Sequence, residues 1–298
     1  MIINQTPLRV SFFGGSTDNP AFIKKYKKSI VINLASSLRT YSAFFKDKYG
    51  FNSQFQNYIL NYRKREVVLN VNLIKNDVIR ECLKKHNITP VSVYLTSDIF
   101  STGSGLASSS SYIISLLKCI YKYKNITKSN YNLIKEALMI ERKFNKFCGY
   151  QDPFGCAIPG IKLISTEDDN EYSIRQLSTD IFKTYNLYLL PSFIDRNSQE
   201  ILQSLSKQLD LIYPIYEVAK EAEKLFLNKK YLKFFKLMKV SWDLKKKSSN
   251  QIIKNSKLTK IDNLLERDKD IVSHKLLGAG FGGSFLIVSK KKKPYNTL

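Results

Sequence analysis

Residues 99–118, IFSTGSGLASSSSYIISLLK, carry the pattern that decides the fold. A β-type run leads into two glycines, Gly103 and Gly105, which are followed by four serines, 108–111, and an apolar helix pattern. The glycines allow a tight turn that can approach a ligand closely. The serines stand where the helix begins, so free backbone N–H groups, hydroxyls and the positive end of the helix dipole point at one place. The stretch predicts a rigid anion cradle whose natural occupant is a phosphate.

Three familiar motifs do not fit this stretch. A Walker loop needs a Lys-Ser or Lys-Thr pair after its second glycine, and the first lysine here is Lys118, well inside the helix. A dinucleotide-binding loop needs a third glycine where Ser108 stands. A serine-hydrolase elbow needs G-x-S-x-G with a histidine partner; the elbow is absent, and the histidines are His86 and His274. On this stretch alone, a glycine- and serine-rich turn before a capped helix fits about equally well.

Size and composition favour a soluble protein. The 298 residues are enough for one large domain or two ordinary ones, and no run of 18 or more apolar residues occurs. The start of the sequence lacks the basic region and apolar core of a signal peptide, so we expect a cytoplasmic protein without a membrane span. The four cysteines show no C-x-x-C spacing and are interpreted as reduced core thiols. The sequence does not predict an oligomeric state.

The charge is strongly positive, with 48 Lys and Arg against 25 Asp and Glu, a net charge of +23. A nucleic-acid binder is therefore an alternative. The lysines are spread along the whole chain, however, without an arginine-rich patch or a known nucleic-acid module. A solvated lysine surface that also attracts small anionic substrates is the preferred interpretation, and Lys290–Lys293 reads as a soluble tail.

Strand and helix patterns along the chain predict an α+β protein with a loose domain boundary near 155–175. Strands are expected at 2–13, 29–46, 66–71, 90–97, 161–165 and 185–192, with a final strand after the turn at 278–283. Helices are expected to start at Pro20 and to span 75–86, 107–124, 130–146, 197–208, 210–228, 230–247 and 256–267. Residues 147–155 are expected to form a glycine-flanked loop.

Four charged residues are candidates for chemistry. Arg9 lies in an apolar strand, where an arginine usually pairs with a carboxylate or phosphate. Asp18 can cap a helix or accept hydrogen bonds from substrate hydroxyls. Glu141 can form a surface ion pair or serve as a Mg²⁺ ligand. Asp152 can sit in a turn or act as a general base.

The last glycines, Gly278, Gly280 and Gly283, formally match G-x-G-x-x-G. A dinucleotide fold would place a helix after them and an acid about 20 residues further on. Here a strand pattern follows, and the sequence stops at 298. We therefore expect a hairpin-like turn that another segment or a ligand approaches closely.

Together these segments resemble the superfamily of galactokinase, homoserine kinase, mevalonate kinase and phosphomevalonate kinase, the GHMP kinases. The resemblance lies in TPLRVSFFGGSTDNP (6–20), GSGLASSS (103–110), IERK with GYQDPFG (140–155) and KLLGAGFGGSF (275–285), with a further stretch at FIDRNSQEIL (193–202). Within it, the chain is most similar to the heptose 7-phosphate kinase group. It implies an α+β, two-domain fold, with a ribosomal-protein-like ATP-binding domain at 1–160 and an α/β domain at 161–298.

The resemblance also implies roles for individual residues. Asp152 would be the catalytic aspartate and Arg9 would stand beside it. Mg²⁺ would be held by Ser109 and Glu141. ATP would be wrapped by Gly103, Ser104, Gly105, Leu106, Ala107, Ser108 and Ser109. The sugar would be bound by Gly15, Ser16, Asp18, Gln151, Arg196, Gly280 and Gly282.

Four positions depart from the family pattern. Ala107 replaces a glycine, which we expect to fit if φ there is negative. Ser16 and Pro153 also differ, and both can reshape the sugar pocket. Phe281 stands where glycine is usual.

The implied activity is transfer of phosphate from Mg·ATP to a sugar, with the anomeric hydroxyl of a heptose 7-phosphate as the first hypothesis. A galactose- or fucose-type sugar kinase is a neighbouring alternative. A non-catalytic sensor and an RNA-binding protein belong to other classes, and RNA binding predicts a steep dependence of affinity on salt.

Overall fold

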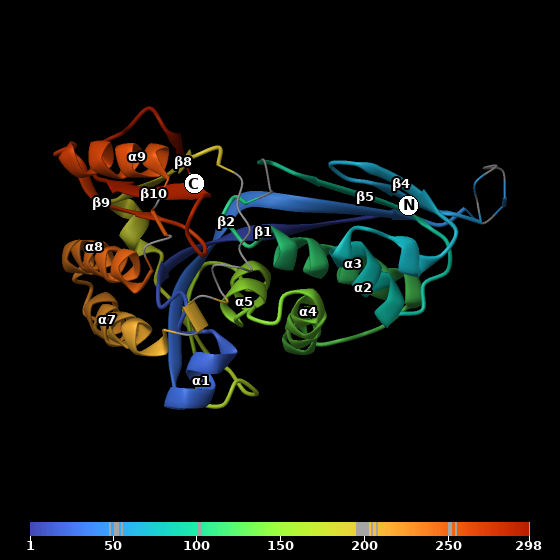
Figure 1. Cartoon of the computed structure of the whole chain (residues 1–298), viewed down its shortest axis with the longest axis horizontal. Coiled ribbons are helices and arrows are strands. Elements are labelled where there is room, and N and C mark those ends of the chain that lie inside the picture. The colour runs from blue at the N-terminus through green and yellow to red at the C-terminus, as the bar shows by residue number, and fades with distance from the viewer. Residues whose placement is uncertain are drawn as a thin grey trace.

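The computed structural model describes residues 1–47, 49–50, 54, 56–99, 103–194, 203, 205–206, 208–249, 252–253 and 255–297. They form two lobes, each a sheet with helices packed on it (Figure 1). None of the described helices is apolar over a length that could cross a membrane.

The larger sheet is built around one long strand. Its strands are β1 (Ile2–Phe13), β2 (Ser29–Phe45), β3 (Tyr58–Asn61), β4 (Arg65–Val68), β5 (Ser92–Ser97), β6 (Ile161–Thr166) and β7 (Ser173–Leu177). The order is β4-β3-β5-β2-β6-β7, with β1 also paired to β2. β2 pairs with β1 on one side, and on the other with β6 through its first half and β5 through its second. Alternating and β-branched residues suit it to this central place.

Helices cover one face of this sheet (Figure 1). They are α1 (Pro20–Tyr26), α2 (Asp77–Lys85), α3 (Ser108–Lys124), α4 (Asn130–Phe144) and α5 (Gln151–Ala157), with short 3₁₀ turns at Val71–Leu73 and Asp180–Lys183. The buried face of α3 carries Ile113, Leu117 and Ile120, as its sequence period predicts. α1 begins at Pro20 with Asn19 as its cap, so Asp18 is free of the capping role.

The smaller lobe contains the end of the chain. Its strands are β8 (Asn186–Pro191), β9 (Ile271–Leu276), β10 (Ser284–Ser289) and β11 (Asn296–Thr297), in the order β11-β8-β10-β9. Its helices are α7 (Leu209–Leu227), α8 (Tyr231–Ser248) and α9 (Ser256–Arg267). The end of β1 joins the two lobes, because Phe12 and Phe13 stack edge-on against Phe234 of α8 in one continuous core.

Several sequence-based expectations need correction. The expected loop at 147–155 ends in α5, which starts at Gln151 and carries Asp152 in its first turn. The strand expected at 66–71 is shorter, forms β4 and pairs with β3. Strands β3, β7 and β11 were not predicted. The expected helix at 197–208 falls mainly outside the described residues. Lys293 is not in a free tail, since its ammonium contacts Asp268 at 2.8 Å.

The strands after residue 160 still belong to the larger sheet. β6 pairs with β2, and β7 pairs with β6. A boundary drawn by sheet membership therefore falls between Leu177 and Asn186, later than residue 160. All four cysteines are buried and unpaired, as expected.

Candidate active site

One cavity of about 490 Å³ lies where the two lobes meet. It is lined by the turn after β1, the start of α3, the end of α4, the start of α5, and by α8 and the turn after β9. The sequence segments singled out for their glycines and acids thus converge on one space, although they lie far apart in the chain.

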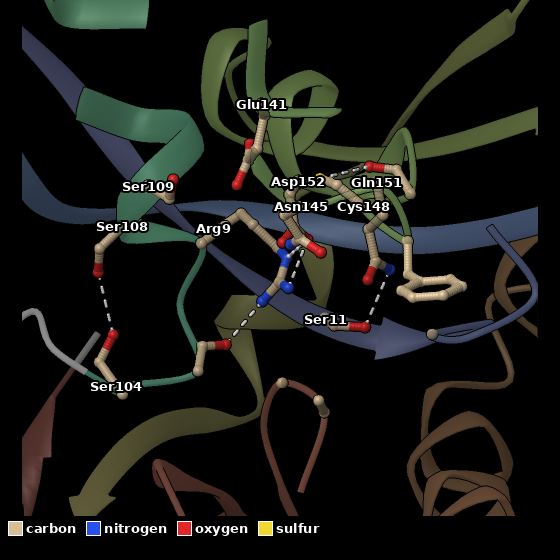
Figure 2. A pocket seen from close by; sticks show the side chains of 18 of the residues that line it. Arg9, Ser11, Ser104, Ser108, Ser109, Glu141, Asn145, Cys148, Gln151 and Asp152 are labelled. Atoms are coloured by element: carbon tan, nitrogen blue, oxygen red, sulfur yellow. Dashed lines mark hydrogen bonds and ion pairs between the residues drawn. The ribbon is translucent and has the colours of Figure 1, made fainter. Parts of the chain in front are cut away.

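The anion cradle forms as predicted at the start of α3. Gly103 and Gly105 have φ values of 67° and 82°, in the region that favours glycine. A Cβ on Gly105 would lie 2.5 Å from the carbonyl oxygen of Leu277, so the cradle is pressed against the turn after β9. The hydroxyls of Ser104 and Ser108 lie 3.1 Å apart across the loop (Figure 2). The free N–H groups of the first turn of α3 therefore face the cavity, where an anion can bind them.

Arg9 and Asp152 form the central ion pair. Nε and Nη2 of Arg9 donate to Oδ1 of Asp152 at 2.9 and 2.5 Å, and Nη1 donates to the carbonyl of Gly105 at 2.8 Å (Figure 2). Gly155 of α5 packs on the Arg9 stem, and a Cβ there would come within 3.0 Å of it. Arg9 is 4 % exposed, so the pair is held rigidly between cradle and α5.

Asp18 lies on the other side of Asp152. Its two oxygens accept from the backbone N–H groups of Ser16 and Gln151, at 3.0 and 3.3 Å. Burial, with the neighbouring Asp152 carboxylate, raises the pKa of Asp18 to about 6. Gly149 is required here, because a Cβ would lie 1.9 Å from Oδ2 of Asp18. The side-chain amide of Gln151 donates to Ser11 at 3.0 Å, which fixes its orientation (Figure 2).

Glu141 lies between Ser109 and Asp152 (Figure 2). It is 3 % exposed and accepts a hydrogen bond from the hydroxyl of Ser110, the neighbour of the serine expected beside it. Burial, followed by the charge of Asp152, raises the pKa of Glu141 to about 7.

These residues fit a divalent cation bound together with phosphate. The buried hydroxyl of Ser109 has no hydrogen-bond partner among the described residues, which leaves its lone pairs for a ligand. The described part of the chain holds no cluster of three or more His, Cys, Asp or Glu that could bind a metal unaided. Mg²⁺ usually takes one or two carboxylates and completes its octahedron with water and substrate phosphates.

Comparison with known proteins bears on this arrangement. Residues 72–160, which include α2 to α5, match the family model described as the GHMP kinases N terminal domain. This part of the chain is a GHMP kinase N-terminal domain.

Relatives of this chain match over nearly its full length. A D-glycero-alpha-D-manno-heptose 7-phosphate kinase of Campylobacter jejuni is 25 % identical over all of this chain and 92 % of its own. A crystal structure of a D-glycero-D-manno-heptose 1-phosphate kinase from Bacteriodes thetaiotaomicron covers 97 % of the chain and 89 % of its own, at 16 % identity and a TM-score of 0.73. The structure of Streptococcus pneumoniae phosphomevalonate kinase, in complex with phosphomevalonate and AMPPNP, covers 98 % of this chain and 93 % of its own, at 14 % identity and a TM-score of 0.77. The two structures support the two-domain α+β GHMP kinase fold.

Three of the departures from the GHMP kinase pattern share one backbone property. Ser16, Ala107 and Phe281 have φ values of 83°, 60° and 62°. The condition under which Ala107 was expected to fit, a negative φ, is therefore not met. The backbone keeps the left-handed conformation that suits glycine, and each replacement costs about 1–2 kcal/mol of strain. Pro153 lies in the first turns of α5, where a proline is tolerated.

Most of the expected site residues line the cavity between the lobes. They are Arg9, Gly15, Ser16, Asp18, Gly103, Ser104, Gly105, Ala107, Ser108, Ser109, Glu141, Gln151 and Asp152. Leu106 is fully buried and belongs to the core instead. Gly280 and Gly282 do not line it; that turn contributes Gly278 and Ala279, and Gly280 faces Ile252. Arg196 lies outside the described residues.

Two further groups of residues, which were not predicted from the sequence, line the cavity. One comprises Tyr62, Arg63, Asn76 and Tyr112, and the other comprises Ser241, Lys245 and Lys275. Lys275 carried the same signal as Arg9, a charged residue in an apolar strand. Lys245 opens the run Lys245–Lys247, so nothing local marked it among the many surface lysines.

Proposed function

We propose that this GHMP kinase uses ATP and Mg²⁺ to phosphorylate a sugar hydroxyl, and that its acceptor is D-glycero-D-manno-heptose 7-phosphate, phosphorylated on the anomeric oxygen. The observation that carries the proposal is the Arg9–Asp152 pair between the cradle and the Asp18 loop. A carboxylate fixed beside a phosphate cradle is what a kinase needs where acceptor and phosphate meet. The Campylobacter jejuni heptose 7-phosphate kinase, similar over the whole chain, supports the choice of acceptor.

In this mechanism the first turn of α3 holds the triphosphate through its free N–H groups. Ser109 and Glu141 would hold Mg²⁺, which neutralises phosphate charge when bound. The acceptor hydroxyl loses its proton to Asp152, its oxygen bonds to the γ-phosphorus, the bond from that phosphorus to the bridging oxygen breaks, and ADP leaves. Both contacts from Arg9 end on Oδ1 of Asp152, so Oδ2 is the oxygen that can take the proton. The Nη1 bond to Gly105 keeps the guanidinium beside the transferring phosphate.

The test is ADP release measured against a panel of sugars and sugar phosphates. We expect release that requires Mg²⁺ and the acceptor, and that falls roughly a thousandfold in Asp152→Ala. Asp180→Asn, which changes an aspartate paired with Lys183 on the surface, serves as the control and should leave the rate unchanged. Unaltered turnover in Asp152→Ala would remove the assigned base, and no release with any sugar would remove the sugar-kinase proposal.

A further inference from the structure

Two lysines of the smaller lobe line the active-site cavity. Lys245 projects from α8 and Lys275 from β9, and Ser241 lies one helical turn before Lys245. Nζ of Lys275 donates to the carbonyl of Phe12 at 2.9 Å. Phe12 follows Ser11, whose hydroxyl accepts a hydrogen bond from Gln151. Both residues lie on the side of Asp152 where the sugar is proposed to bind. The Lys275 ammonium therefore belongs to the acceptor end of the cavity.

Lys275 lacks a compensating charge. It is 5 % exposed, its hydrogen-bond partner is a neutral carbonyl, and no carboxylate lies within 4.0 Å of it in the part of the chain that the structure describes. The pKa of Lys275 lies well below its usual range, first because its ammonium is buried and then because the positive charges of Lys245 and Arg9 repel it. Arg9 is balanced by Asp152, but no described carboxylate balances Lys275.

A buried cation in this setting is unfavourable until an anion reaches it. In the proposed mechanism the cradle on α3 binds the triphosphate, so the anion that reaches these lysines would enter with the other substrate. The sugar hydroxyls have their own partners near Asp18 and Gln151, which face the same space from the larger lobe.

We propose that Lys245 and Lys275 bind a phosphate ester that the acceptor carries away from its reacting hydroxyl, and that they select sugar phosphates over neutral sugars. This inference rests on the proposed kinase function and assigns its acceptor specificity to two residues. The lysines act as point charges on the ester oxygens. Ser241 lies on the same face of α8, within reach to add a hydroxyl donor.

The kinetic test compares heptose 7-phosphate with the unphosphorylated heptose in the full-length protein. We expect a wild-type preference of about 100-fold in kcat/KM for the phosphorylated sugar, which is typical of a charge pair removed from water. Lys275→Met and Lys245→Met should each abolish most of this preference, with the neutral sugar and the KM for ATP unchanged within about threefold. Lys247→Met, an exposed lysine on the same helix, is the matched control and should keep the preference.

Three results would overturn the inference. Equal losses on both sugars would show a structural role, and a raised KM for ATP alone would assign the lysines to the nucleotide. A preference for uronic acids over sugar phosphates would make the bound group a carboxylate instead.

A calorimetric titration tests the lysines without turnover. Heptose 7-phosphate should bind the wild type and Lys247→Met equally well in the presence of ADP, whereas its Kd should rise about 100-fold in Lys275→Met. An unchanged Kd in Lys275→Met would contradict the proposal. Because this arm needs no catalysis, it remains decisive even if no sugar is phosphorylated.

Discussion

Ser109 and Ser110 are adjacent and chemically identical, but their hydroxyl groups have different surroundings. The hydroxyl of Ser110 donates to the buried carboxylate of Glu141, whereas the hydroxyl of Ser109 is buried without a partner among the described residues. The same substitution, serine to alanine, should therefore have opposite consequences at the two positions.

The expected magnitudes follow from these contacts. Ser110→Ala removes a donor from a carboxylate that is 3 % exposed, and loss of a hydrogen bond to a buried charged group costs about 1.5–3 kcal/mol of folding stability. Ser109→Ala breaks no intramolecular hydrogen bond, so the free energy of unfolding should change by less than about 0.5 kcal/mol. If Ser109 binds Mg²⁺, its loss should instead raise the Mg²⁺ concentration for half-maximal rate about tenfold or more, a usual penalty for groups that support a metal.

Two assays separate the effects. Urea denaturation without metal or nucleotide gives the stability change, and Mg²⁺ titration of the kinase rate gives the metal dependence. Both assays belong at pH 8.5, above the pKa of about 7 of Glu141, so that the carboxylate is ionised in the wild-type protein. The reasoning is refuted if Ser110→Ala raises the Mg²⁺ requirement more than Ser109→Ala does, or if Ser109→Ala is the more destabilised protein.

Three further predictions concern stability. Ala107→Gly should raise the free energy of unfolding, measured by urea denaturation, by about 0.5–1 kcal/mol. The relief of backbone strain at a φ of 60° exceeds the cost of the conformational entropy that glycine adds to the unfolded chain. A decrease would show that the Ala107 Cβ packs favourably. In the metal-free wild type, the Glu141 carboxyl binds its proton more tightly in the folded than in the unfolded protein. Its contribution to the free energy of unfolding should therefore fall by about 3 kcal/mol as pH rises from 4.5 to about 7. Denaturation of Glu141→Gln, measured across the same pH range, should lack that fall. Lys162→Met should cost about 2–4 kcal/mol in urea, because the Lys162 ammonium donates to the carbonyls that end α5; an unchanged midpoint would contradict this account.

The sequence predicted the elements with a strong period and the residues that are chemically conspicuous. The strand at 2–13 and the helix that starts at Ser108 were both found within a residue or two. Arg9 was conspicuous as a charge in an apolar strand, and it does pair with a carboxylate.

Other features depend on tertiary contacts and were not predictable locally. The start of α5 reads as a loop because Gly149, Pro153 and Gly155 all disfavour a helix. The helix forms there because Gly155 fits against Arg9, and Gly149 against Asp18, contacts made by residues more than a hundred positions away. The role of Lys245 also depends on residues distant in the chain, since its ammonium reaches the carbonyl of Gly278, whereas Lys246 pairs with Asp262 and Lys247 is exposed.

β1 explains why so many distant segments share one cavity. At Arg9 the backbone N–H donates to the carbonyl of Leu106, which fixes the cradle, while the guanidinium holds Asp152 of α5. Three residues later the carbonyl of Phe12 accepts from Lys275, and its ring packs on α8. One strand thus positions the phosphate cradle, the proposed base and the proposed ester-binding lysine by main-chain and core contacts. A change that shifts β1, such as Phe12→Ala, should therefore lower catalysis with every acceptor, whereas loss of Lys275 should act on phosphorylated acceptors alone.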